Sequence, residues 1–415
     1  MRLAALAWRY LWSRPLVSAL NLMLLSLGLA AVGFVLLVSE QIEQGMRRDL
    51  AGVDLVVGAK GSPMQIMLAG VFHLDVPTGN IPLRTLDSLR AQPLVARALP
   101  ISLGDSFKGH RIVGTTPDYL ELYGARVAEG RLWSAPMQAV LGAEAARRTG
   151  LKPGDRFAGS HGLGEQGDAH AGHDYEVVGV LAPSGSVLDR LVLTDLASVW
   201  QVHEAMHGPA SDAAHDEHEG HDDHADHDAD AQAGREITMV LLSYRSPLAA
   251  ISLPRWVNAQ DGLQAAAPAL ETARLLRMVG AGAEVLRGFG WVLLLSASLS
   301  VFVALLHAVR ERQADLAMMR MLGAPPWRVG VLVSLEGLWL ALLATVIGLV
   351  LAHGLTQLLG LYLAAEQSVR LDGAWLSRWE LLIPVVAVLL ALLAAAWPAW
   401  RAYRLDVTEL LQAPH

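Results

Sequence analysis

The sequence predicts a membrane α-helical protein with four transmembrane helices and a large mixed α/β extracytoplasmic domain inserted after the first helix. Hydrophobic residues make up 53% of the 415-residue chain, above the usual share in soluble domains. Four apolar runs reach the roughly 20 residues that a helix needs to cross a bilayer. They occupy residues 16–39, 288–309, 329–356 and 381–400. Residues 40–287, between the first two runs, contain no other run of that length.

Residues 1–15 predict an amphipathic helix on the inner membrane face. Its arginines meet no acidic residue, and its two tryptophans lie one helical turn apart, as expected for anchors at the headgroup level. These residues are Arg2, Arg9, Arg14, Trp8 and Trp12. A secretory signal peptide is the competing interpretation. However, the 24 uncharged residues of 16–39 are too many for one, and no small-x-small cleavage site closes them cleanly.

Residues 40–287 alternate short β-like runs with helical stretches, which predicts a mixed α/β domain. Strands are expected at 53–57, 111–114, 139–141, 175–181 and 191–194, and helices around 85–92 and 142–149. Gly58, Gly61 and Pro63 are expected to end the first strand. Polar helical stalks at 40–50 and 270–287 flank this domain, and a His-rich loop covers residues 203–234.

Composition and motifs exclude several classes of function. The chain has no cysteine, so disulfides, thiolate metal sites and a cysteine nucleophile are ruled out. The sequence G-A-K-G-S-P, from Gly58, lacks the G-x-x-x-x-G-K-[ST] pattern of a phosphate-binding loop, and no such pattern occurs elsewhere. The formal net charge of −8 owes much to residues 215–230, which hold eight carboxylates. Because the remainder is balanced, we expect no nucleic-acid partner.

The segment between the second and third apolar runs, residues 310–328, is short and rich in arginine. Such an excess in a short loop marks the cytoplasmic side of a membrane. Its sequence R-E-R-Q-A-D-L-A-M-M-R-M-L-G-A, from Arg310, resembles the cytoplasmic loop of the MacB/FtsX/LolC-type ABC transporter permease family. Segments starting at Val140 and Tyr175 resemble, more loosely, the extracytoplasmic domain of the same family. The ending from Pro398 resembles the C-terminal sequence of that family.

In that family the cytoplasmic loop forms a short coupling helix that docks on a separate ATPase. The resemblance therefore implies a non-catalytic permease subunit of an ABC transporter. The implied coupling residues are Arg310, Glu311, Asp315, Arg320, Leu322 and Gly323. Movement of the motor would pass through this loop and the stalks to the outer domain, a mode of action known as mechanotransmission. Residues 357–380 would form an outer loop, and residues 401–415 a cytoplasmic tail.

The resemblance also implies partners and a location. We expect a dimer of permease copies with two cytoplasmic ATPase subunits, which bind ATP and Mg²⁺, while this chain itself holds no nucleotide. The implied location is the bacterial inner membrane, in contact with membrane lipids, with the large domain in the periplasm. A periplasmic protein or a lipoprotein is the further partner that this family suggests for the outer domain.

Glu336 is the only formal charge between residues 329 and 357. An ionisable residue within a transmembrane helix usually faces protein or water and often has a function. Pairing with a nearby arginine, such as Arg320 or Arg328, is the alternative interpretation.

The loop at 203–234 is unusually rich in histidine, and ten of the 15 histidines fall between residues 161 and 227. Neutral imidazole together with carboxylate suits Zn²⁺ or another divalent metal ion. The candidate ligands are His203, His207, His215, His218, His221, His224 and His227. A metal-buffering loop, a defined metal site and a solvated acidic loop without function all remain open.

The sequence from His203 to His207 matches H-E-x-x-H, in which two histidines bind zinc and the glutamate acts as a base. A membrane-anchored zinc metalloprotease is therefore one alternative function. A metal-ion carrier with a His-rich loop is another. The carrier would need ionisable residues within its transmembrane helices, and only Glu336, His307 and His353 are present there.

Overall fold

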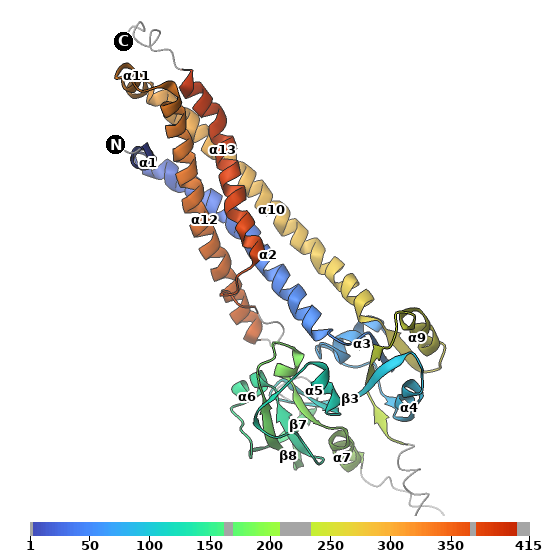
Figure 1. Cartoon of the computed structure of the whole chain (residues 1–415). Coiled ribbons are helices and arrows are strands. Elements are labelled where there is room, and N and C mark those ends of the chain that lie inside the picture. Colours follow the sequence, from blue (N-terminus) through green and yellow to red (C-terminus); the bar gives the residue numbers. More distant parts are fainter. Residues whose placement is uncertain (1–2, 162–168, 208–233, 366–370, 405–415) are drawn as a thin grey trace, which may run out of the picture. The chain divides into compact units, whose positions relative to one another are not determined.

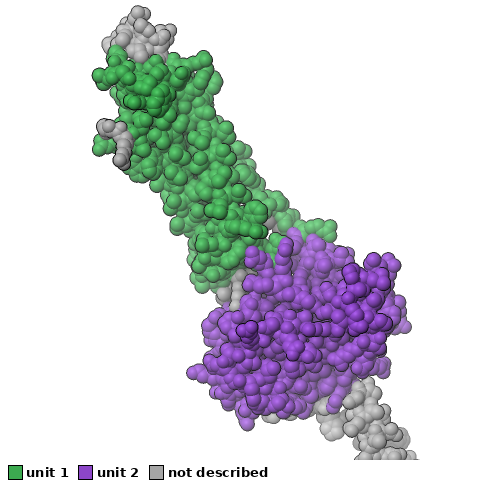
Figure 2. All heavy atoms as spheres, in the orientation of Figure 1, with its two compact units in different colours: residues 1–43, 277–415 green, residues 44–276 purple. Residues whose placement is uncertain are grey.

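The structure is a computed structural model that describes residues 3–161, 169–207, 234–365 and 371–404 (Figure 1). It divides into two compact units (Figure 2). Residues 1–43 and 277–415 form the first, which we call the helical unit, and residues 44–276 form the second, which we call the α/β unit. Two long helices contribute residues to both units: α2 (Pro15–Asp49) and α10 (Pro268–Glu311).

Four helices of the described chain are long and apolar enough to cross a membrane (Figure 1). They are α2, α10, α12 (Pro326–Ala365) and α13 (Leu382–Tyr403), the last together with the short 3-10 helix η2 (Arg378–Leu381). Two further short helices are α1 (Leu3–Leu11), before α2, and α11 (Gln313–Met321), before α12.

Glycines allow the long helices to approach one another closely. A Cβ on Gly348 of α12 would lie 2.9 Å from the Cβ of Leu29 on α2. A Cβ on Gly28 of α2 would lie 3.0 Å from the Leu294 side chain on α10. Because lipid tails are as apolar as leucine, helix association in a bilayer depends on close van der Waals packing of this kind. The small residues therefore hold α2 against both neighbours.

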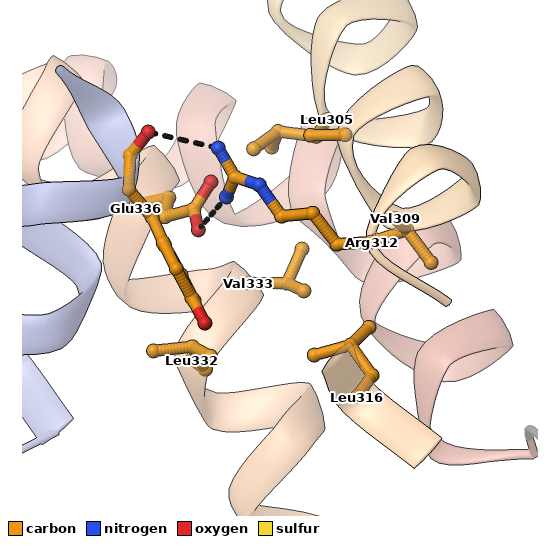
Figure 3. A pocket seen from close by; sticks show the side chains of 9 residues that line it. Leu305, Val309, Arg312, Leu316, Leu332, Val333 and Glu336 are labelled. Atoms are coloured by element: carbon orange, nitrogen blue, oxygen red, sulfur yellow. Dashed lines mark hydrogen bonds and ion pairs between the residues drawn. The ribbon is translucent and has the colours of Figure 1, made fainter. Parts of the chain in front are cut away.

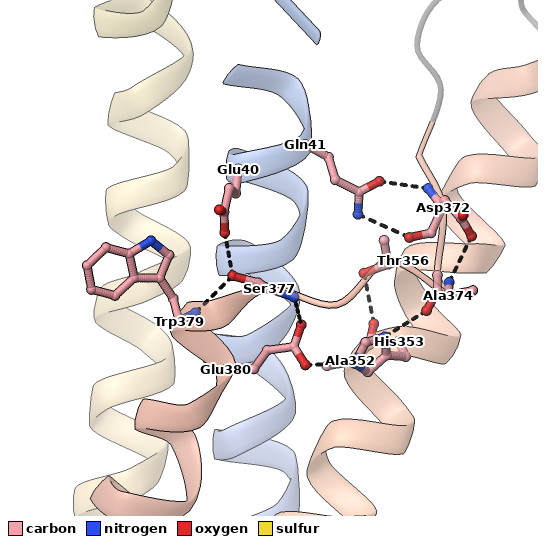
Figure 4. Close-up of polar contacts among 11 residues, drawn as sticks. Glu40, Gln41, Ala352, His353, Thr356, Asp372, Ala374, Ser377, Trp379 and Glu380 are labelled. Carbon is pink, nitrogen blue, oxygen red and sulfur yellow. Dashed lines mark hydrogen bonds and ion pairs between the residues drawn. The ribbon is translucent and has the colours of Figure 1, made fainter. Parts of the chain in front are cut away.

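The segment that precedes α13, residues 371–381, is tied to α2 and α12 by polar contacts (Figure 4). Each contact joins a side chain of one of these helices to the backbone or a side chain of the segment. They are Gln41 with the backbone of Asp372 (2.8 and 3.1 Å), Glu40 with the Ser377 hydroxyl (2.5 Å), and His353 with Gly373 O (2.7 Å) and Glu380 (3.2 Å). This part of the predicted outer loop is therefore held in place by hydrogen bonds.

Helix α12 runs beyond the predicted third transmembrane segment, which ended at residue 356. It continues to Ala365, so the predicted outer loop 357–380 begins within the helix. Helix α13 likewise extends to Tyr403, into the predicted tail 401–415. The predicted bounds are those of the membrane-crossing apolar runs, whereas a helix ends at a cap or a breaker. The apolar residues that follow position 356 continue the helical pattern.

The α/β unit is built on one ten-stranded mixed sheet. In chain order its strands are β1 (Leu55–Ala59), β3 (Val95–Phe107), β4 (His110–Thr115), β5 (Val127–Gly130), β6 (Gln138–Leu141), β7 (Arg156–His161), β8 (Ala169–Leu181), β9 (Val192–Asp195), β11 (Met239–Tyr244) and β12 (Leu263–Ala266). The spatial order is β12-β1-β11-β3-β4-β9-β6-β8-β5, and β7 pairs with β3 and β8. The pairs β4–β9 and β6–β8 are parallel and the others antiparallel. Strands β2 (Ile81–Pro82) and β10 (Glu236–Ile237) form a separate pair.

Helices pack on both faces of this sheet. They are α3 (Pro63–Gly70), α4 (Arg84–Arg90), α5 (Asp118–Leu122), α6 (Ala143–Thr149), η1 (Val187–Arg190), α7 (Leu196–His207) and α9 (Ala249–Asn258). Successive residues of a strand point to opposite faces. Accordingly, Val56 of β1 lies in one core with Ile66 of α3, while Leu55 and Val57 lie in another with Leu253 of α9. Burial on both faces explains why β1 is continuously apolar.

The predicted fold class is confirmed: four candidate membrane helices flank a mixed α/β domain that follows the first of them. The five predicted strands correspond to β1, β4, β6, β8 and β9. The prediction that Gly58 ends the first strand is wrong. Gly58 pairs with Met239 on one side and Gln264 on the other, and β1 ends only at Ala59. Pairing on both sides outweighs the low strand propensity of glycine.

His73 is a buried histidine in an unusual conformation. Its φ of 53° lies in the left-handed region, and its side chain is almost fully buried. Nε2 lies 3.1 Å from the Tyr119 hydroxyl, while Nδ1 has no hydrogen-bond partner. Burial, and then the charge of Arg111, lowers the pKa of His73 to about 3. The imidazole is therefore neutral in the folded chain at physiological pH.

The His73 environment predicts acid sensitivity of the α/β unit. Unfolding returns the pKa of His73 to its ordinary value near 6.5, so the unfolded chain binds a proton that the folded chain does not. The contribution of neutral His73 to the free energy of unfolding is therefore complete above pH 6.5 and falls between pH 6.5 and about 3. At pH 5 the expected loss of unfolding free energy is about 2 kcal/mol. Urea unfolding of the detergent-solubilised chain at pH 7 and pH 5 measures it.

The matched control is His73→Asn, because asparagine tolerates a positive φ and does not titrate. The variant should lose about 2 kcal/mol less stability than the parent between pH 7 and pH 5. An equal loss in both proteins would contradict this assignment.

Candidate functional site

Helix α11 occupies the middle of the arginine-rich segment 310–328. It buries Leu316 and Ala317 against the helical unit. Asp315 and Met318 are exposed, and Leu322, directly after the helix, is 83% exposed. Residues three and four apart lie on the same side of a helix, so these three residues share a face. The helix thus presents an uncovered apolar surface with an acidic residue at its edge.

The sequence R-x-L-G-A at the end of α11 is a helix stop. Gly323 has a φ of 94°, the left-handed conformation that glycine adopts most easily. Its N–H donates to the Arg320 carbonyl (3.0 Å), and the N–H of Ala324 donates to the Met319 carbonyl (3.1 Å). These two bonds are the Schellman motif. Pro326 then begins α12 at a position where its missing N–H costs nothing.

Arg312 lies at the break between α10 and α11, and its guanidinium contacts two other helices (Figure 3). One nitrogen donates to the Glu336 carboxylate of α12 (3.0 Å). The other donates to the Tyr10 carbonyl (2.9 Å) and to the Ser13 hydroxyl (2.6 Å), at the end of α1. The guanidinium also lies 4.3 Å from the centre of the Tyr10 ring. Burial, and then the Asp315 charge, raises the pKa of the Tyr10 hydroxyl.

The Arg312–Glu336 pair lies in an apolar surrounding. Its side chains are 15% and 8% exposed, respectively. The hollow beside them has a volume of about 10 Å³, at the lower limit for a single water molecule. Its apolar lining consists of Leu305, Ala308, Val309, Leu316, Leu332 and Val333 (Figure 3). Such a space holds no substrate, so the arrangement serves to fix helices.

Two weaker contacts also join α1, and the turn that follows it, to the rest of the helical unit. Glu311 forms an ion pair with Arg14, in which both side chains are about half exposed. Exposed pairs contribute roughly 0–1 kcal/mol. Trp339 of α12 donates a hydrogen bond to the Ala4 carbonyl (3.2 Å).

The structure brings some of the predicted site residues together and separates others. Arg310 is exposed at the end of α10, and Arg320 is half-buried on α11. As the alternative interpretation held, Glu336 pairs with an arginine, but the partner is Arg312 rather than Arg320 or Arg328. Sequence distance favoured the nearer arginines. The signal that could have found Arg312 is its place at a helix break, from which a long side chain can reach back toward α12.

The candidate metal ligands lie mostly outside the described residues. His203 and His207 fall at the end of helix α7, but their side chains are outside the description. His215, His218, His221, His224 and His227 lie entirely outside the described residues. Among the described residues, no group of three or more His, Asp or Glu side chains is arranged to hold a metal ion.

The ionisable residues that a carrier would need are not assembled. Glu336 and His353 are both on α12, and the 17 positions between them correspond to about 25 Å of helix. His353 contacts Glu380, and the Nδ1–H of His307 donates locally to the Val303 carbonyl (3.0 Å). Each residue therefore has its own local partner.

Comparison with protein-family models identifies the chain. A model of the FtsX-like permease C-terminal region matches residues 287–407, and a model of the MacB-like periplasmic core domain matches residues 18–218. The chain belongs to the MacB/FtsX-type ABC transporter permease family. It is thus a permease of a generally non-catalytic class, with the α/β unit corresponding to the periplasmic core domain. No curated protein matches this permease.

Two solved structures are similar to part of the permease. The periplasmic region of MacB from Actinobacillus actinomycetemcomitans has a TM-score of 0.34 and 11% identity, covering 55% of this chain and 95% of its own. The extracellular domain of the noncanonic ABC-type transporter YknZ from Gram-positive bacteria has a TM-score of 0.30 and 12% identity, covering 51% of this chain and 98% of its own. The family assignment rests on the two family models.

The buried Arg312–Glu336 pair of the permease predicts that substitutions of its two residues have strongly non-additive effects on stability. Glu336→Leu leaves the Arg312 guanidinium buried without its carboxylate, which should cost about 3–5 kcal/mol. Combining it with Arg312→Leu removes the unpaired charge and should recover most of that loss. Thermal unfolding of the purified chain in detergent measures both. Glu284→Leu is the matched control, because Glu284 forms an exposed pair with Arg287 on α10. Equal destabilisation by Glu336→Leu and Glu284→Leu would refute the role of the buried pair.

Proposed function

We propose that this permease couples ATP hydrolysis by a separate cytoplasmic ATPase to movement of its periplasmic α/β unit. The observation that carries the proposal is helix α11, which exposes Met318, Met321 and Leu322. An uncovered apolar patch on a short helix fits a groove on a protein partner. The chain lacks a phosphate-binding loop of its own, so the nucleotide belongs to that partner.

The long helices supply a route for the movement. Helix α2 has 35 residues and α10 has 44. At 1.5 Å per residue these correspond to about 50 and 65 Å, well beyond the roughly 30 Å of a hydrocarbon core. A displacement received at α11 would pass across the break at Arg312 to α10 and then along that helix, whereas a flexible joint within the helix would absorb it.

We further propose the assembly that this mechanism requires. Two permease copies with two ATPase subunits, each binding ATP and Mg²⁺, would act in the bacterial inner membrane. The α/β unit would then act on a periplasmic protein or a lipoprotein. The family membership supports an ATPase partner in general terms.

Two substitutions that add a carboxylate at the end of α11 test the proposal. Arg320→Glu reverses a charge on the helix, and Gly323→Asp replaces the glycine of the helix stop. Each should weaken co-purification of the ATPase, and the associated Mg²⁺-ATP hydrolysis, by on the order of tenfold or more. Arg255→Glu, an exposed position on α9 of the α/β unit, is the control and should change neither. If the two α11 variants keep both properties, α11 is not the coupling element.

We also propose that the His-rich loop links the permease to divalent metal ions, because histidines recur among carboxylates there. Removing residues 211–234 should abolish most weak Zn²⁺ binding by the full chain, measured by calorimetry, and leave its thermal stability unchanged. Retained Zn²⁺ binding would disprove this role.

Glu204→Gln discriminates the protease alternative. It should leave transport-linked ATP hydrolysis intact, since a base in H-E-x-x-H matters only to a protease. Loss of a Zn²⁺-dependent peptidase activity on this substitution would instead establish the protease.

A further inference from the structure

We propose, resting on the function proposed above, that Arg312 is a positioning residue of the coupling element: it fastens the N-terminal helix α1 to the start of α11, so that α1 and α11 move as one body. A permease of this kind would then receive the motor's movement on two helices rather than on α11 alone.

The polar part of this attachment is at the end of α1. The last carbonyls of a helix have no partner within the helix and carry partial negative charge. Arg312 places a positive charge there and donates to the Tyr10 carbonyl and the Ser13 hydroxyl. The Ser13 hydroxyl in turn donates to the same Tyr10 carbonyl (2.7 Å). Arg312 therefore acts as a cap supplied to α1 by a residue about 300 positions away in sequence.

The apolar part of the attachment is a buried stripe on α1. Ala7 is 0% exposed and Leu11 is 5% exposed. Both lie in one hydrophobic core with Leu305 and Val309 of α10, Leu316 of α11 and Leu332 of α12. The core that orients α11 is thus also the core that receives α1.

Arginine suits this position. Its planar fork presents separate nitrogens, one directed to Glu336 on α12 and the other to the end of α1. A lysine would carry the same charge beside Glu336 but bring a single ammonium group. Arg312→Lys therefore preserves the charge balance of the buried pair while removing the second set of contacts, which separates attachment of α1 from overall folding.

The first experiment measures undocking of α1 directly and needs no ATPase. Because the native chain has no cysteine, Leu11→Cys provides a single thiol that reacts with N-ethylmaleimide only when α1 leaves its core. Arg312→Lys should raise the labelling rate of this thiol about tenfold, as expected for loss of a charge-assisted hydrogen bond. Arg9→Gln, which removes an exposed charge from α1 itself, should change the rate less than about twofold.

A second cysteine reporter distinguishes local undocking of α1 from general unfolding. Ala387→Cys on α13 is fully buried at a site away from α1. Its labelling should stay slow in the Arg312→Lys background, which shows local undocking. Faster labelling at both sites would mean general unfolding and would overturn the proposal, as would an unchanged rate at Leu11→Cys.

The second experiment tests positioning during coupling. In the complex with its ATPase, Arg312→Lys should reduce stimulation of ATP hydrolysis severalfold while co-purification stays at the parent level, because the exposed face of α11 is intact. Parallel loss of both would assign Arg312 a structural role only. If no ATPase co-purifies with the parent chain, the proposed function fails while the labelling result still stands.

Discussion

The helical unit depends on one buried ion pair. Arg312 and Glu336 are removed from water together, and each alone would be costly to bury. A buried ion pair of this kind adds little stability compared with apolar residues of the same size, yet it fixes which groups must meet. Here it specifies that α10 breaks at one residue, that α12 presents its carboxylate to that break, and that the end of α1 lies beside it.

The same ion pair also fixes the start of the short helix α11. Helix α11 begins directly after the anchored Arg312 and ends at the left-handed Gly323, so both of its ends are defined by local chemistry. Between them, Leu316 holds the helix to the core and Met318 faces outward. A helix fixed in this way can receive a force and pass it to the body to which it is anchored. In the proposed function that body includes the long helices that continue into the α/β unit.

Much of this architecture can be predicted from the sequence, because the length of apolar runs and the placement of arginines obey simple physical rules. The four membrane helices and the R-x-L-G-A helix stop follow from local patterns. The partner of Glu336 does not, since Arg312, Tyr10 and Ser13 converge from segments that are far apart in the chain. The continuation of β1 through Gly58 also depends on strands more than 180 residues away. Local propensity carries no information about such tertiary pairing.

In the proposed function, α11 is the surface on which an ATPase docks. Leu322→Cys, at an 83% exposed position in a chain without cysteine, can be crosslinked with a short bismaleimide to the co-purified ATPase and identified by mass spectrometry. Leu376→Cys, 78% exposed in the segment before α13, is the matched control. We expect a crosslink to the ATPase from Leu322→Cys alone. A crosslink from Leu376→Cys with none from Leu322→Cys would contradict it.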